Sequence, residues 1–290
     1  MPKVRLLSRQ ELDGDRAVAL AEFVPVLLAE GDSWFAAGAV PAHNFLQALD
    51  FNSHGAVINL AALPGDHLAL EAAVRARAAH RRIHRWTSGL LRFVAEPTAQ
   101  LYDAIVLSAG GADLIDALPH LLRRNRAGQC VAASLQEAIE PAALAAFDRY
   151  LRANLTELVS ALRERGGVNR DVPVFCHTYD IPTANDAPPC IAGVASGSAW
   201  LQPTLRAAQL APDLWQPLID HLFGHLAATL RSLALPDFHV VSTQGLLERA
   251  RVGARGDSGD WENEWHPNTS GWRKLAHKLA AAISDEIGLQ

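Results

Sequence analysis

The chain has 290 residues and a net charge of −5, and 49% of its residues are hydrophobic and 20% charged. These values are typical of one globular domain over residues 1–290 and exclude a disordered chain. Basic and acidic residues are interleaved and no apolar run reaches the length of a membrane span, which excludes a nucleic-acid-binding stripe and a transmembrane segment.

Short apolar runs alternate with long segments of helical periodicity along the whole chain. Strands are expected at 24–29, 56–60, 104–108, 172–177 and 238–242. Helices are expected at 66–85, 113–125, 135–164, 212–233 and 268–287. Because the strand runs are nearly continuous in apolar residues, they are typical of a parallel sheet buried on both faces. The fold class is therefore α/β, with helices on both sides of the sheet.

Two long connections, 180–212 and 253–266, are rich in proline, glycine or polar residues. Loops of this length in a compact domain usually carry function. Ligands of open α/β sheets bind beyond the carboxyl ends of the strands. We therefore expect the site at that edge.

Cysteine usage and the N-terminal sequence bear on the compartment. Cys130, Cys176 and Cys190 cannot all pair with one another and lie at no metal-ligand spacing, which favours a reducing compartment. The apolar run 17–29 contains a glutamate and a proline and lacks a small-residue cleavage site, unlike a signal peptide. We expect a cytoplasmic protein without a metal or another cofactor.

A candidate nucleophile directly follows the first expected strand, in Gly31-Asp32-Ser33. Serine is a weak nucleophile unless a base accepts its proton. A tight turn at this point would expose the Ser33 hydroxyl at the sheet edge and aim its backbone N–H at a developing oxyanion. The G-x-S-x-G pattern of α/β-hydrolases is absent, because Phe35 occupies the place of its last glycine.

A candidate base, His266, lies far along the chain, just before Pro267 and the last expected helix. The chain thus contains four short blocks in order: 31–33, 59–61 with Gly65, 110–113 and 266–267. Each lies at the end of an expected strand or just before the last expected helix. In this order and spacing they resemble the SGNH/GDSL esterases of bacterial type.

The resemblance implies a flavodoxin-like three-layer α/β/α sandwich with five parallel strands in the order 2-1-3-4-5. It also implies that Ser33 attacks an ester and that His266 acts as general base and then general acid. Backbone N–H groups of Ser33 and Gly65 would stabilise the oxyanion.

Two positions depart from the family pattern. Ala112 stands where the family has an asparagine whose amide is the third oxyanion donor, and loss of one such donor lowers turnover by roughly 10²–10³ in other hydrolases. Asn263 stands where the family has the acid that orients the histidine. Asp260 could serve instead and is weighed equally with Asn263, while Glu264 is a weaker candidate.

The tryptophans next to these residues, Trp34, Trp261 and Trp265, have two interpretations. They pack in the core, or Trp34 and Trp265 line an apolar substrate pocket. The sequence thus predicts a serine esterase for a small-molecule carboxylic ester of small acyl, lipid or polyester-like type. The alternative is a degenerate member that binds an ester, glycan or lipid with little turnover. The sequence specifies neither the ester nor an oligomeric state.

Overall fold

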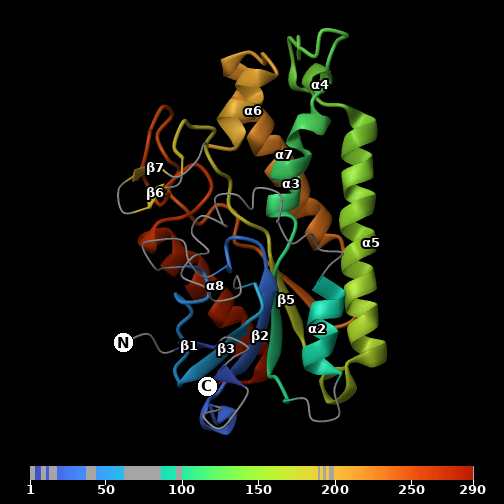
Figure 1. Ribbon diagram of the computed structural model, residues 1–290, viewed down its shortest axis with the longest axis vertical. Helices are drawn as coiled ribbons and strands as arrows, with labels where there is room; N and C mark the ends of the chain where they lie inside the picture. The colour runs from blue at the N-terminus through green and yellow to red at the C-terminus, as the bar shows by residue number, and fades with distance from the viewer. Residues whose placement is uncertain are drawn as a thin grey trace.

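The computed structural model describes residues 4–7, 11–12, 18–36, 44–61, 86–95, 100–188, 190–191, 194–195 and 199–289. Its centre is a parallel sheet in the order β1-β3-β2-β4-β5-β8 (Figure 1). The strands are β1 (Val4–Leu7), β2 (Val26–Gly31), β3 (Gly55–Asn59), β4 (Ala104–Ser108), β5 (Val174–His177) and β8 (Phe238–Val241). The four inner strands β3, β2, β4 and β5 are buried at every residue, as strands covered on both faces should be.

The order of the five expected strands, 2-1-3-4-5, is confirmed by β3-β2-β4-β5-β8. The number of strands was wrong, because β1 adds a sixth at the edge and pairs with β3 from Val4 opposite Gly55 to Leu7 opposite Ile58. Only the two ends of β1 are buried and Arg5 is exposed. A strand of four residues on a sheet edge therefore has no continuous apolar run by which its sequence would reveal it.

The helices are α2 (Trp86–Val94), α3 (Gly111–Leu121), α4 (Leu135–Ala138), α5 (Pro141–Arg165), α6 (Leu201–Ala207), α7 (Trp215–Arg231) and α8 (Thr269–Ile287). Short 3-10 turns occupy Leu20–Glu22, Gly167–Asn169 and Pro212–Leu214. A two-stranded hairpin, β6 (Cys190–Ile191) with β7 (Val194–Ala195), lies in the connection 180–212 together with α6. The expected helix 66–85 lies outside the described residues.

Two layers of helices flank the sheet. Helices α2, α3, α5 and α7 contact one another on one side, and α8 lies on the other side (Figure 1). The expected helix 135–164 is divided into α4 and α5, because Ile139 is extended and Glu140 caps a new helix by accepting from the Ala142 N–H. Pro141 then occupies the first turn, where its missing N–H costs nothing.

Two helix starts bring backbone to the carboxyl edge of the sheet. Gly110, in the left-handed region at φ 101°, turns the chain from β4 directly into α3. Asn268 caps α8 and accepts from the Gly271 N–H. The loops after β2, β4, β5 and β8 therefore meet at one end of the sheet.

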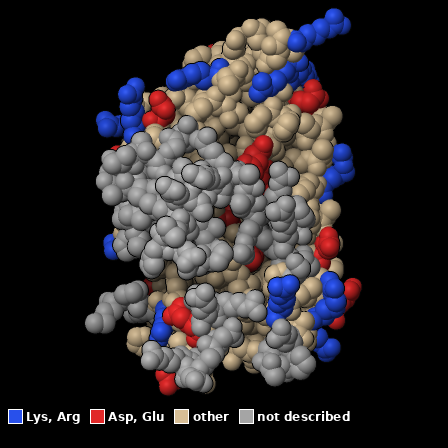
Figure 2. Space-filling model, viewed as in Figure 1, with Lys and Arg blue, Asp and Glu red and all other residues tan. Residues whose placement is uncertain are grey.

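On the face shown in Figure 2, Lys and Arg side chains of the described part lie scattered among acidic ones around the rim. None of the helices in the described ranges is long and apolar enough to cross a bilayer. Cys130 and Cys176 are buried free thiols.

Candidate active site

The turn that presents Ser33 is held by Asp32. The Asp32 carbonyl accepts from the N–H groups of Phe35 and Ala36, both at 3.1 Å, and its carboxylate accepts from the Trp34 N–H at 3.1 Å. Gly31 is required before it, because a Cβ there would lie 2.7 Å from the Ser108 Cβ. Ser33 is left half-buried at the end of β2, and its N–H has no acceptor in the described part of the chain.

His266 reaches Ser33 from the loop before α8. Its Nε2 lies 2.9 Å from the Ser33 Oγ, although the two residues are 233 positions apart. The Asn263 side-chain oxygen accepts from the N–H groups of Trp265 at 2.9 Å and His266 at 2.8 Å, which fixes the turn that carries the imidazole. The structure thus brings the expected nucleophile and base within hydrogen-bond distance, and their roles stay a prediction.

Asn263, Asp260 and Glu264 are the three candidates for orienting His266. The side chain of each accepts hydrogen bonds from backbone N–H groups. Asn263 binds the His266 turn as described above. The Asp260 carboxylate accepts from Lys274 Nζ of α8 at 2.5 Å and from the Glu248 N–H at 2.6 Å. Burial opposes ionisation of Asp260, but these bonds outweigh it and lower its pKa. Asp260 therefore anchors the loop to α8.

Glu264 joins the same loop to α6. Its buried carboxylate accepts from the N–H groups of Trp200, Leu201 and Gln202 at 2.5, 2.7 and 2.8 Å. Burial raises the pKa of Glu264 to about 7. The Trp200 ring in turn packs edge-on against the His266 ring at 5.7 Å, so the turn that carries His266 and α6 form one packed unit.

The expected oxyanion donors have different outcomes. The Ser33 N–H has no acceptor among the described residues, and Gly65 lies outside them. Ala112 has a methyl side chain, and its backbone N–H donates to the Asp32 carboxylate at 3.2 Å. Ala112 therefore contributes to the support of the Ser33 turn and has no side-chain donor to offer.

A buried polar cluster beneath Ser33 was missed by the sequence analysis. The Asp32 carboxylate accepts from Ser108 Oγ at 2.8 Å and from Tyr179 OH at 2.6 Å, and Ser108 Oγ lies 2.9 Å from His177 Nε2. Burial raises the pKa of Asp32 and of Tyr179 and lowers that of His177 to about 3. The available signal was that each of these residues ends or directly follows an otherwise apolar strand.

The protons of this cluster can be assigned from its contacts. His177 Nδ1 accepts from the Tyr179 N–H at 3.2 Å, so the ring proton is on Nε2 and is donated to Ser108. The Ser108 hydroxyl then donates to Asp32. A Ser–His–Asp arrangement is thus present, but the serine lies between the other two residues, and the histidine has no lone pair directed at it.

Tyr179 completes the cluster by adopting an unusual backbone. Its φ of 59° is rare for a residue with a side chain. This conformation directs its hydroxyl onto both Asp32 and Ser108, the latter at 3.0 Å. The cluster therefore links the ends of β2, β4 and β5 directly below the Ser33 turn.

The two tryptophans expected to line a pocket lie in different surroundings. Trp34 has no exposed surface and stacks on His177 at 5.3 Å, which agrees with packing rather than with substrate contact. Trp265 is also buried, but its indole N–H donates to the Ser33 Oγ at 3.2 Å. Trp261 is buried as well.

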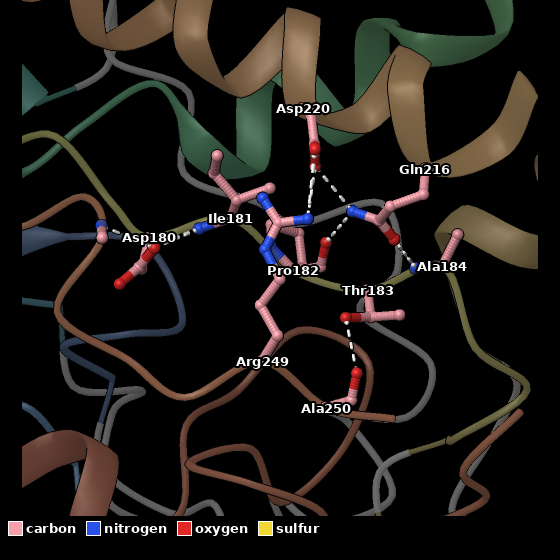
Figure 3. Close-up of polar contacts among 10 residues, drawn as sticks. Asp180, Ile181, Pro182, Thr183, Ala184, Gln216, Asp220, Arg249 and Ala250 are labelled. Atoms are coloured by element: carbon pink, nitrogen blue, oxygen red, sulfur yellow. Dashed lines mark hydrogen bonds and ion pairs between the residues drawn. The ribbon is translucent and has the colours of Figure 1, made fainter. Parts of the chain in front are cut away.

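The loops that carry the site are tied together by the contacts shown in Figure 3. Asp180, just after β5, accepts from the N–H groups of Ile181, Gly245 and Leu247 at 2.7, 2.9 and 2.7 Å. Gln216 of α7 donates to the Pro182 carbonyl at 3.0 Å, and Thr183 donates to the Ala250 carbonyl at 3.2 Å (Figure 3).

An exposed ion pair between Arg249 and Asp220 at 3.1 Å adds a contact with α7 (Figure 3). The connection 180–212 and the loop that leads to His266 are thereby held against each other. Within the described ranges, no group of three or more His, Cys, Asp or Glu side chains could hold a metal ion.

No protein-family model matches the chain, and no curated protein matches it. Solved structures of esterases do match. They include a carbohydrate esterase family 3 protein from Talaromyces cellulolyticus, at 10% identity over 91% of this chain and 99% of that one, with a TM-score of 0.42. A member of the lipolytic protein G-D-S-L family from Veillonella parvula matches at 10% identity over 90% and 99%, with a TM-score of 0.43.

The inhibitor-bound aryl esterase of M. smegmatis matches at 13% identity over 92% of this chain and 100% of that one, with a TM-score of 0.43. The structural neighbours are thus esterases of the SGNH/GDSL type. With TM-scores below 0.5, these matches support no argument about this chain, and its function has to be argued from its own residues.

Proposed function

We propose that the protein is a serine esterase in which Ser33 is the nucleophile and His266 is the general base. The observation that carries the proposal is the 2.9 Å contact between Ser33 Oγ and His266 Nε2 at the carboxyl edge of the sheet. Both residues are half-buried rather than enclosed, so a substrate can reach them. The open Ser33 N–H beside them is a donor for an oxyanion.

In the proposed reaction, Ser33 Oγ attacks the ester carbonyl carbon while its proton passes to His266 Nε2. The carbonyl electron pair moves onto oxygen, and the Ser33 N–H donates to this oxyanion. When the intermediate collapses, the bond to the alkoxy oxygen breaks and that oxygen takes the proton from His266. Water, activated by His266, then attacks the acyl-Ser33 ester and releases the carboxylic acid.

Ser108 is a second candidate nucleophile, because it contacts both a histidine and an aspartate. Two observations favour Ser33 over it. Ser108 has no exposed surface, and His177 donates its Nε2 proton to Ser108 instead of accepting one. Burial also lowers the pKa of His177 to about 3, which makes it a poor base at neutral pH.

A degenerate protein that binds an ester, glycan or lipid without efficient turnover is the alternative from another class. Ala112, which lacks the third donor, and Asn263, which carries no charge, motivate it. It predicts the same fold and the same Ser33–His266 contact, so only kinetics can separate the two functions.

The test compares Ser33→Ala with Ser108→Ala, using p-nitrophenyl acetate as a small acyl ester. The proposal expects a burst of p-nitrophenol in the wild type that Ser33→Ala abolishes while its melting temperature is retained. Ser108→Ala should keep the burst in the folded fraction. A fluorophosphonate probe should label the peptide that contains Ser33, as read by mass spectrometry.

Three results would count against the proposal. Labelling of Ser108 would transfer the nucleophile to the buried cluster. A wild type that, like Ser33→Ala, hydrolyses acetate, butyrate and longer acyl esters no faster than the uncatalysed rate would favour the degenerate protein. A Ser33→Ala variant with wild-type turnover would exclude Ser33 under either assignment.

A further inference from the structure

The indole of Trp265 spans the space between the nucleophile and the start of α3. Its N–H donates to Ser33 Oγ at 3.2 Å. At its other end, a Cβ added to Gly111 would lie 2.8 Å from Trp265 Cη2. The ring therefore reaches from Ser33 to Gly111, the residue before Ala112, whose methyl side chain offers no donor.

We propose that the Trp265 indole N–H is a catalytic hydrogen-bond donor to the oxyanion, in the place that Ala112 leaves without one. This inference rests on the proposed function of Ser33. In the free enzyme the N–H binds the Ser33 Oγ lone pair. After attack, Oγ becomes an ether-type oxygen, and the negatively charged oxygen on the same carbon is the stronger acceptor within reach.

No atom is gained or lost through Trp265 in this step. The Oγ–C bond forms, the carbonyl electron pair becomes the oxyanion lone pair, and the serine proton resides on His266. The indole keeps its own proton and only changes acceptor. An indole N–H suits this role because it is donor-only and does not ionise.

Packing fixes the indole before substrate arrives. The Trp265 ring stacks on Tyr179 at 5.6 Å and 22°, and contacts Phe223 at 5.7 Å and Trp34 at 5.3 Å. The Trp34 indole N–H donates to the Trp265 carbonyl at 3.2 Å. A buried donor that does not reorganise during the reaction stabilises developing charge more effectively than a mobile one.

The same feature explains why glycine occupies position 111. A Cβ there would also meet the Tyr179 ring, 2.5 Å from Cε1 and 2.6 Å from Cζ. Position 111 therefore touches both the Trp265 ring, which carries the indole N–H, and the Tyr179 ring that stacks on it. The close approach of α3 to Trp265 is thus built into the backbone.

The experiment removes the N–H in two ways. Trp265→Phe deletes it together with part of the ring, and site-specific incorporation of benzothienylalanine at 265 replaces the N–H by sulfur with little change of shape. Trp272, a buried tryptophan of α8 in the same aromatic cluster, receives the same two replacements as a matched control. Turnover of p-nitrophenyl acetate and inhibition by phenylboronic acid, which forms a tetrahedral adduct with serine, are measured for each protein.

Both Trp265 variants should lower kcat by about 10²-fold with KM changed less than about threefold. Boronic acid inhibition should weaken in parallel with kcat, since the adduct resembles the intermediate. The Trp272 variants should stay within about threefold of wild type. Circular dichroism and melting temperature identify the folded proteins, and the benzothienyl variant decides the matter if Trp265→Phe does not fold.

The inference is overturned if the benzothienyl protein keeps wild-type kcat, if only KM changes, or if the Trp272 variants lose as much activity. Failure of the proposed function gives a different pattern. In that case Ser33→Ala retains turnover whatever happens at 265. If Ser33→Ala is inactive and the Trp265 variants have wild-type rates, only this inference fails.

Discussion

Ionisation of Glu264 should lower the stability of the folded protein as the pH rises from mildly acidic to alkaline. Its pKa is about 7 in the folded protein, against 4.5 for an ordinary glutamate, because burial penalises the charged form more than the N–H groups of α6 stabilise it. The folded state therefore binds a proton that the unfolded state releases. Stability from this group is fully present below about pH 4.5 and is lost as the pH rises through about 7.

The shift corresponds to about 3 kcal/mol in total. Most of it, about 2–3 kcal/mol, falls between pH 5 and pH 8. Glu264→Gln removes the titration. Its amide cannot accept from all three N–H groups, so at pH 5 the variant should be about 1–3 kcal/mol less stable than wild type. The stability of the variant should then not change with pH through this position.

The assay is urea unfolding of both proteins at pH 5 and pH 8, with the free energy of unfolding extrapolated to water. Wild type should lose about 2–3 kcal/mol more than Glu264→Gln on going from pH 5 to pH 8. The comparison cancels other titrating groups, because both proteins share them. Parallel pH profiles, or a wild type that gains stability toward pH 8 relative to the variant, would refute the reasoning.

Other substitutions separate positioning from folding. Asn263→Ala should lower kcat by roughly 10–10² and, because it leaves two backbone N–H groups without their acceptor, should also lower the free energy of unfolding by about 1–3 kcal/mol. Asp260→Ala should lower the free energy of unfolding by about 1–3 kcal/mol but change kcat less. A larger loss of kcat in Asp260→Ala than in Asn263→Ala would make Asp260 the residue that orients the histidine. Gly31→Ala should lower the melting temperature and cost about 1–3 kcal/mol, because its Cβ would meet a β4 side chain at 2.7 Å, and an unchanged transition in calorimetry would contradict this. Ala112→Asn should raise kcat, most clearly in the Trp265→Phe background, and equal or lower rates in folded protein would mean that no donor is missing there.

The inner strands could be predicted because each is an unbroken apolar run between helical segments, whereas their order was implied only by the resemblance to the SGNH/GDSL esterases. The pairing of Ser33 with His266 was implied by the same resemblance, through short polar blocks beside easily recognised elements. Strand β1 and the division of the expected helix 135–164 into α4 and α5 could not be predicted from the sequence. A half-exposed edge strand has no strong pattern, and a helix break depends on a single cap and proline.

The buried cluster shows what local sequence cannot reveal. Ser108 and Tyr179 meet Asp32 across 76 and 147 positions of chain. Each residue alone is only a polar residue at a strand end, and its role depends on strand order, φ and side-chain direction together. The same holds for Trp265, whose N–H can be assigned to Ser33 only when the ring orientation is known.

Because Trp265 and His266 are consecutive residues on one Asn263-capped turn, they cannot leave Ser33 independently. Any opening of that turn withdraws the proton acceptor and the indole donor in the same movement. Partial opening should therefore convert molecules from active to inactive instead of slowing all of them slightly. Heat inactivation would then follow the opening of this one loop, at temperatures where the sheet beneath it is still folded.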